Sequence, residues 1–223
     1  MTTKHKKEKK TSTLYKLTDG DGKTRNDTQW GPGVSHSGTG EGGLCGPGWI
    51  HAYENPLIAV LLNPIHADFK HPRLWEAEGE IAIRDGQLKC GCKTLTTIRE
   101  IPLPEITTEM RVRFAILCAK DVCACSAWNA WADKWLSGKD RSAAAAAAAR
   151  AAMAAYDAAA CAAWAAAAAE AFAAGAYRAS WSAAGAAEAA ASAAYRSARS
   201  AACCGMDLVA IAENACSGLR NFA

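Results

Sequence analysis

The stretch "GPGWIHAYENPLIAVLLNPI", residues 46–65, decides how the first half of the chain folds. Its segment "WIHAY" is a short run of β-type residues, and the pair Asn55-Pro56 behind it is a typical helix start. Asparagine is a good N-cap, and proline at the first helical position loses no hydrogen bond. The apolar residues that follow predict a short helix. The pair Asn63-Pro64 should end this helix, because a residue that precedes proline avoids the α region.

Two polar residues of this stretch, His51 and Glu54, are candidates for a catalytic site. A histidine and a carboxylate can share general acid–base work, and Glu78 on a later acidic strand is a third candidate. A histidine beside a helix start is more often a hydrogen-bonded structural residue, however, and acidic residues along a strand more often form a solvated face. We therefore assign no catalytic residue from the sequence, and we expect no cofactor.

The segments around this stretch predict strands and a long loop. Residues 13–17, "TLYKL", alternate and predict a strand. Residues 18–48 are rich in glycine and polar residues and should be mostly loop, without either of the usual phosphate-binding glycine patterns. Residues 73–85, "RLWEAEGEIAIRD", predict a half-buried strand that ends in the tight hairpin pair Asp85-Gly86. Residues 87–101 should return as one or two strands.

Helical patterns begin at residue 105. Residues 105–135 predict a helix in which Trp128, Trp131 and Trp135 form one stripe, because their spacing is i, i+3, i+7. A tryptophan stripe of this kind is typical of a core or an interface, and not of a ligand site.

Alanine dominates the chain from residue 143 and makes up 38 of the 60 residues over 143–202. Alanine has the highest helix propensity, and the region contains no proline. One straight helix of this length would extend roughly 90 Å and would bury little surface. We therefore expect two or more packed helices that break near Gly175, with Gly185 as a second candidate for a break, and with Trp164 and Trp181 buried at their contacts.

Together these patterns predict an α+β protein with a small mixed-strand head followed by an alanine-rich, all-α region of packed helices. A disordered basic tail is expected over residues 1–12. The head, with its long glycine-rich loop, should cover residues 13–104. The helical region should cover residues 105–223 and end in a closing helix at about 206–219.

The net charge of +3 comes from one end of the chain. Residues 1–16 hold six lysines against Glu8, which leaves 19 basic and 21 acidic residues in the remainder. A short basic tail can make weak contacts to nucleic-acid phosphates, although such tails are more often only solvated. The chain shows neither a secretory pattern nor an uninterrupted apolar run of about 18 residues. We therefore expect a cytoplasmic protein without membrane contact.

Ten cysteines without an export pattern predict reduced thiols. Four of them, Cys90, Cys92, Cys123 and Cys125, are the candidates for a metal such as zinc, which four thiolates can hold. Their C-x-C spacing is shorter than that of the usual zinc pairs, and the second pair falls in a segment that is expected to be helical. Small buried thiols are the commoner case, so no metal site is assigned.

The same elements resemble a group of bacteriophage and prophage proteins of unknown function. In these proteins a small α+β head with a Gly-aromatic-x-His-x-x-Glu-Asn-Pro element and a following acidic strand precedes an alanine-rich helical tail. The matching residues are Gly48, Trp49, His51, Glu54, Asn55 and Pro56, and then residues 74–80. The resemblance implies this architecture and a location in the host cytoplasm, and it carries no known activity.

In topology alone, the head is also similar to ADP-ribosyltransferase folds, with a first strand, a glycine-rich loop, a strand–helix element and an acidic strand. Those enzymes need a histidine or arginine on the first strand to hold the nicotinamide ribose, and "TLYKL" contains neither. Tyr53 and Glu78 or Glu80 would have to take the remaining places. An enzyme of this kind, using His51 and a nearby carboxylate, is the alternative function.

The expected function is that of a non-enzymatic interaction or structural module that binds an unknown protein or other macromolecule. The alanine-rich helices, the aromatic stripe and the incomplete set of catalytic groups all favour it. Self-association through the alanine-rich helices is a further possibility of this class.

Overall fold

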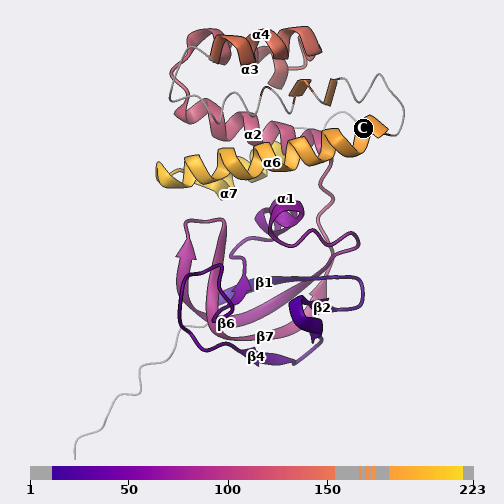
Figure 1. The fold of residues 1–223 in the computed structure, drawn as a ribbon, viewed down its shortest axis with the longest axis vertical. Coiled ribbons are helices and arrows are strands. Elements are labelled where there is room, and N and C mark those ends of the chain that lie inside the picture. Colours follow the sequence, from indigo (N-terminus) through magenta and orange to yellow (C-terminus); the bar gives the residue numbers. More distant parts are fainter. Residues whose placement is uncertain (1–11, 154–165, 167–168, 171, 174–180, 218–223) are drawn as a thin grey trace, which may run out of the picture. The chain divides into compact units, whose positions relative to one another are not determined.

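The computed structural model describes residues 12–153, 166, 169–170, 172–173 and 181–217 (Figure 1). These residues form two compact units. The barrel unit contains residues 12–56, 70–85 and 89–103, and the helical unit contains residues 57–69, 86–88 and the described residues from 104 onward. The predicted combination of an N-terminal sheet with helices after it is confirmed.

The barrel unit is built on one antiparallel sheet with the neighbour order β1-β6-β7-β4, and β5 also pairs with β7 (Figure 1). Strands β6 and β7 are joined after Asp85, which confirms the predicted hairpin. The strands are β1 (Ser12–Thr18), β4 (Ser35–Ser37), β5 (Ile50–Ala52), β6 (Arg73–Asp85) and β7 (Lys89–Ile101).

The sheet closes on itself into a small barrel. Tyr53, directly after β5, pairs with Tyr15 of β1 through two backbone hydrogen bonds of 2.8 and 2.9 Å. Since β1 pairs with β6, β6 with β7 and β7 with β5, this bridge completes the ring. Closure satisfies backbone groups that an open sheet would leave at its edges. The buried core of the barrel is Leu14, Trp30, Ala52, Ala77, Cys90, Cys92 and Leu95.

Residues 18–48 contain more regular structure than the predicted loop. Strands β2 (Lys23–Thr24) and β3 (Thr28–Gln29) pair with each other around a short 3-10 turn, and β4 pairs with residues 94–96 of β7. Strands of two or three residues are too short to show an alternating pattern, so their partners elsewhere in the sheet determine them.

Helix α1 (Pro56–His66) begins at the predicted proline but does not end at Asn63. Pro64 lies inside the helix, so the expected helix end is wrong. A proline there has no N–H to donate to the carbonyl of Val60, four residues earlier. Arg111 supplies the missing donor, because its Nη2 lies 3.3 Å from the Val60 oxygen.

The predicted helix over residues 105–135 is two helices, separated at Cys123–Cys125 where the backbone is extended. The tryptophan stripe is confirmed as core, since Trp128, Trp131 and Trp135 are at most 6% exposed. The described helices of this unit beyond α1 are α2 (Thr108–Val122), α3 (Ser126–Leu136), α4 (Ala143–Met153), α6 (Trp181–Cys203) and α7 (Leu208–Ser217).

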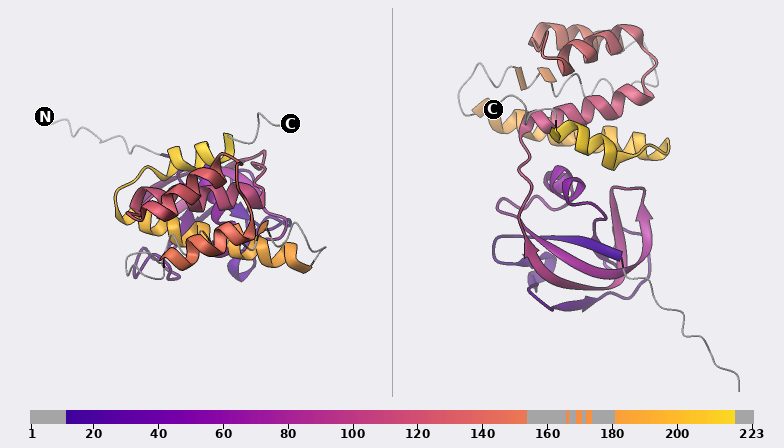
Figure 2. Two further views of the ribbon diagram at one scale, coloured as in Figure 1. Left: turned by 90° about the horizontal axis from the view of Figure 1, so that it is seen from above. Right: turned by 180° about the vertical axis from the view of Figure 1, so that it is seen from behind.

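The alanine-rich region contributes α4 and α6. Helix α6 packs along α2 (Figure 1 and the right view of Figure 2), and it buries an alanine stripe with helical spacing. This stripe is Ala191, Ala194, Ala198 and Ala201. A break near Gly185 is wrong, because α6 continues through that glycine and a single glycine costs only about 1 kcal/mol in a helix. Gly175, Trp164 and the side chain of Trp181 lie outside the described residues.

Helix α7 confirms the predicted closing helix. Asp207 caps it, since its Oδ1 accepts hydrogen bonds from the backbone N–H groups of Val209 and Ala210 at 3.1 and 3.2 Å. Within the described part of the chain, every helix is too short or too polar for a membrane span.

Candidate functional site

A lysine lies inside the barrel. Lys16 of β1 points to the same side of the strand as the core residue Leu14, and only 8% of it is exposed. Its Nζ donates a 2.8 Å hydrogen bond to the backbone carbonyl of His51 and lies 5.0 Å from the centroid of the Trp30 ring. Burial lowers the pKa of Lys16 to about 8. Among the described residues of the barrel unit, this amine is therefore the cation whose pKa is lowered most strongly, and no sequence pattern marks it.

Two cysteine thiols share the interior with Lys16. Cys90 and Cys92 lie on one face of β7 and are fully buried, and the Cys90 Sγ donates to the carbonyl of Ala52 at 3.4 Å. The contact with Cys90 and then the charge of Lys16 lower the pKa of Cys92, whereas the contact with Cys92 and burial raise the pKa of Cys90. Lys16, Cys90 and Cys92 thus place three polar groups among the buried residues of the barrel unit, which also include Thr18 and Thr97.

His51 holds a loop against the barrel. Its ring is half-buried, and Nε2 contacts the backbone oxygen of Leu44, so this nitrogen carries the proton that is donated. Burial lowers the pKa of His51; the Leu44 carbonyl opposes this, and the charges of Lys89 and Lys16 add to it. The ring is therefore neutral at pH 7.

The loop that His51 holds is the glycine loop, residues 38–48. Its backbone folds tightly on itself, because Gly40 donates to the Gly48 carbonyl at 2.8 Å. A Cβ atom on Gly48 would lie 2.0 Å from the Glu41 oxygen, so only glycine fits there. The Lys89 Nζ also contacts the Cys45 Sγ at 3.2 Å. The loop is thus folded compactly, and side chains from β5 and β7 hold it to the barrel.

The two carboxylate candidates lie on the surface of the barrel unit. Glu54 forms a bidentate ion pair with Arg84, at 2.9 and 3.1 Å, and Glu78 is exposed on β6. Neither carboxylate is among the groups that contact the His51 ring or shift its pKa. The structure therefore does not bring the three catalytic candidates together.

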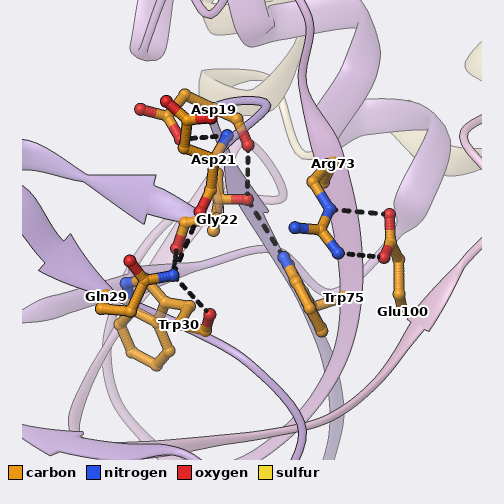
Figure 3. A network of polar contacts seen from close by, with 9 residues as sticks. Asp19, Asp21, Gly22, Gln29, Trp30, Arg73, Trp75 and Glu100 are labelled. Carbon is orange, nitrogen blue, oxygen red and sulfur yellow. Dashed lines mark hydrogen bonds and ion pairs between the residues drawn. The ribbon is translucent and has the colours of Figure 1, made fainter.

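A polar network stabilises the turn that carries Trp30 into the core. The Asp19 Oδ1 accepts the backbone N–H of Asp21 at 3.0 Å, and the Gln29 side chain donates to the backbone carbonyls of Asp21 and Trp30, each at 3.1 Å. These bonds add to the backbone pairing of β2 with β3, which indicates a structural role. Figure 3 shows this network with the nearby ion pair of Arg73 and Glu100.

The four cysteines considered for zinc fall in different units. Cys90 and Cys92 belong to the barrel unit, whereas Cys123 and Cys125 follow α2 in the helical unit. Among the residues that the structure describes, no three side chains of His, Cys, Asp or Glu are grouped to hold a metal ion.

The chain matches none of the protein-family models, curated proteins or solved structures with which it was compared.

Proposed function

We propose that the chain is a non-enzymatic interaction module that binds a protein partner through the barrel unit. The observation that supports this most directly is that polar side chains of the barrel make structural contacts. His51 holds the glycine loop, Glu54 pairs with Arg84, and Lys16 donates to a backbone carbonyl. Each of these groups stabilises a rigid scaffold with a fixed loop, which is a common way to present a binding surface.

The glycine loop and the adjacent strand β4 would form the recognition surface. Ser35 and Ser37 on β4 are exposed and hydrogen-bond the hydroxyls of Thr96 and Thr94, at 3.0 and 2.8 Å. The surface is therefore rich in hydroxyl and backbone polar groups and carries few charges. Such a surface suits a protein partner better than a phosphate backbone, which needs many cations.

Two variants that add the same side chain test this proposal. Gly43→Arg places a bulky group on the loop without a steric conflict, because a Cβ there has no atom within 4 Å. Ala82→Arg is the matched control on an exposed position of β6. With the full-length chain as bait in a bacterial lysate, the wild type and Ala82→Arg should retain a specific protein that Gly43→Arg loses. Equal capture by all three, or no specific capture, would contradict the proposal.

We further propose the setting and the finer architecture that the resemblance implies, namely a phage-encoded protein in the host cytoplasm with a packed, alanine-rich helical region. The buried alanine stripe of α6 supports close helix packing, because methyl side chains let helices approach. The same property would allow self-association of the helices, which concentration-dependent light scattering of the full chain would detect.

A further inference from the structure

A cysteine of the glycine loop and a lysine of β7 are in direct contact. The Lys89 Nζ lies 3.2 Å from the Cys45 Sγ, although the two residues are 44 positions apart in the chain. Asp85 is opposite Lys89 in the β6–β7 register, yet among the described residues it is the Cys45 sulfur, and not this carboxylate, that the amine contacts. The interaction function proposed above makes no use of the reactivity of these two groups.

Contacts on both sides of Cys45 determine where its sulfur lies. Before it, Leu44 packs directly on β7, because a Cβ atom on Gly91 would lie 2.8 Å from the Leu44 Cδ1. After it, Gly46 donates to the Gly43 carbonyl at 2.8 Å and closes a turn that contains Cys45. The fold of the barrel unit therefore brings the sulfur and the amine together.

The two side chains supply the groups that a sulfur–nitrogen bond needs. Peroxides oxidise exposed thiols to sulfenic acids, whose sulfur atom a thiol or a nitrogen atom can then attack. Cys45 is exposed, so a small peroxide can reach it. A deprotonated lysine amine is a nucleophile. Because the Lys89 nitrogen already contacts the sulfur that it would attack, the reaction is a step within one molecule and not a bimolecular encounter.

We propose that Cys45 and Lys89 form a peroxide-dependent modification site, in which a covalent Sγ–Nζ bond links the two side chains. Hydrogen peroxide first oxidises the Cys45 thiol to a sulfenic acid and is itself reduced to water. The Lys89 ammonium then loses one proton to solvent, and its nitrogen attacks Sγ. The S–O bond breaks, and the hydroxyl group leaves as water with a second proton from the nitrogen.

The resulting sulfenamide attaches the glycine loop covalently to β7 and removes the positive charge of Lys89. The link is reversible, because a dithiol reductant returns both side chains to their free forms and is itself oxidised to a disulfide.

The test treats the reduced full-length chain with hydrogen peroxide, blocks the remaining thiols with iodoacetamide and maps the peptides without reductant. We expect a peptide pair that is joined through Cys45 and Lys89 and is lighter than the two separate peptides by two hydrogen atoms. Trypsin should no longer cleave after the linked Lys89, and dithiothreitol should restore the cleavage. The yield should rise with pH, because only the deprotonated amine attacks. A linked pair that retains an oxygen atom would contradict the direct Sγ–Nζ bond.

Lys89→Arg is the matched control, because a guanidinium keeps the positive charge beside Cys45 but stays protonated and does not attack. Dimedone, which traps sulfenic acids, is added at a peroxide concentration that labels Cys45 in this variant. In the wild type, this labelling of Cys45 should be several-fold lower, since the amine competes for the sulfenic acid. Cys203 is also exposed, and no lysine contacts its sulfur in the described part of the chain, so its labelling should be the same in both proteins.

Two results would overturn the proposal. One is the absence of a peptide joined through Cys45 and Lys89 under conditions that oxidise Cys45 in Lys89→Arg. The other is equal dimedone labelling of Cys45 in the wild type and in Lys89→Arg, which would show that the amine does not react with the sulfenic acid.

Discussion

Lys16 shows how much stability a small barrel can lose by burying a single charged residue. Folding removes water from its ammonium group. In the folded chain this group donates to one carbonyl and lies near the face of the Trp30 ring and two thiols. These contacts do not restore what hydration provided, so the pKa falls from 10.5 to about 8. Lys16 consequently destabilises the folded barrel, and favourable contacts of other barrel residues must offset this loss.

Replacing Lys16 should change how stability depends on pH. Between pH 8 and 10.5 the unfolded chain binds more protons than the folded one, so the free energy of unfolding of the wild type rises with pH in this window. The full rise is about 3 kcal/mol, at about 1.4 kcal/mol for each pH unit. Lys16→Met removes this component and keeps the apolar stem. Urea unfolding of both proteins across the window would measure it, and two parallel pH profiles would refute the assignment.

His51 is the second residue whose role the environment determines. His51→Ala removes the hydrogen bond to the Leu44 carbonyl, which should cost about 1 kcal/mol and loosen the glycine loop. Burial lowers the pKa of the ring, so the folded chain binds fewer protons than the unfolded chain as the pH falls below 6.5. Acid therefore destabilises the wild type through this ring, and His51→Ala should lose that component.

Thermal melting and limited proteolysis of the glycine loop would measure these effects of His51→Ala. An unchanged melt and unchanged loop cleavage, combined with the loss of an enzymatic activity, would instead support the catalytic interpretation of this histidine.

Among the elements, α1 shows with Arg111 and Pro64 why local sequence patterns do not predict the whole fold. The sequence predicts where α1 starts, because the cap and the first-turn proline are neighbours in the chain. It does not predict where α1 ends, because the donor that compensates for Pro64 comes from Arg111, about 50 residues later. The barrel depends in the same way on the Tyr15–Tyr53 bridge, and so the burial of Lys16 was not predictable from "TLYKL" alone.

Arg111 should therefore matter most when Pro64 is present. Arg111→Met leaves the carbonyls of Val60 and Leu61 without their side-chain donor, which should cost about 1–3 kcal/mol. Pro64→Ala supplies a backbone N–H for Val60, so part of this loss should be recovered in the double variant. A double-mutant cycle by urea unfolding would measure the coupling. Strictly additive effects would show that Arg111 does not compensate for the N–H group that Pro64 lacks.

At the scale of the whole molecule, the two units interleave along the chain. Residues 57–69 and 86–88 belong to the helical unit although both segments lie between parts of the barrel unit. Helix α1 and the β6–β7 turn thus share a unit with residues that follow position 104. Hydropathy patterns report the type of each element but not its unit, because membership depends on contacts between distant residues.

The net positive charge of the molecule comes from its first 11 residues. They hold five lysines and one glutamate, so a chain that begins at Ser12 has a net charge of −1 instead of +3. Their removal should leave the melting temperature unchanged, because β1 begins at Ser12 and residues 2–11 contain no apolar side chain to bury. Retention on a cation-exchange matrix should fall sharply, and in the full-length chain it should weaken with salt because exposed charges are screened. Melting curves and salt-gradient elution of both chains would measure this. A clear fall in melting temperature would show that these residues stabilise the fold, and equal retention would place the basic surface elsewhere on the molecule.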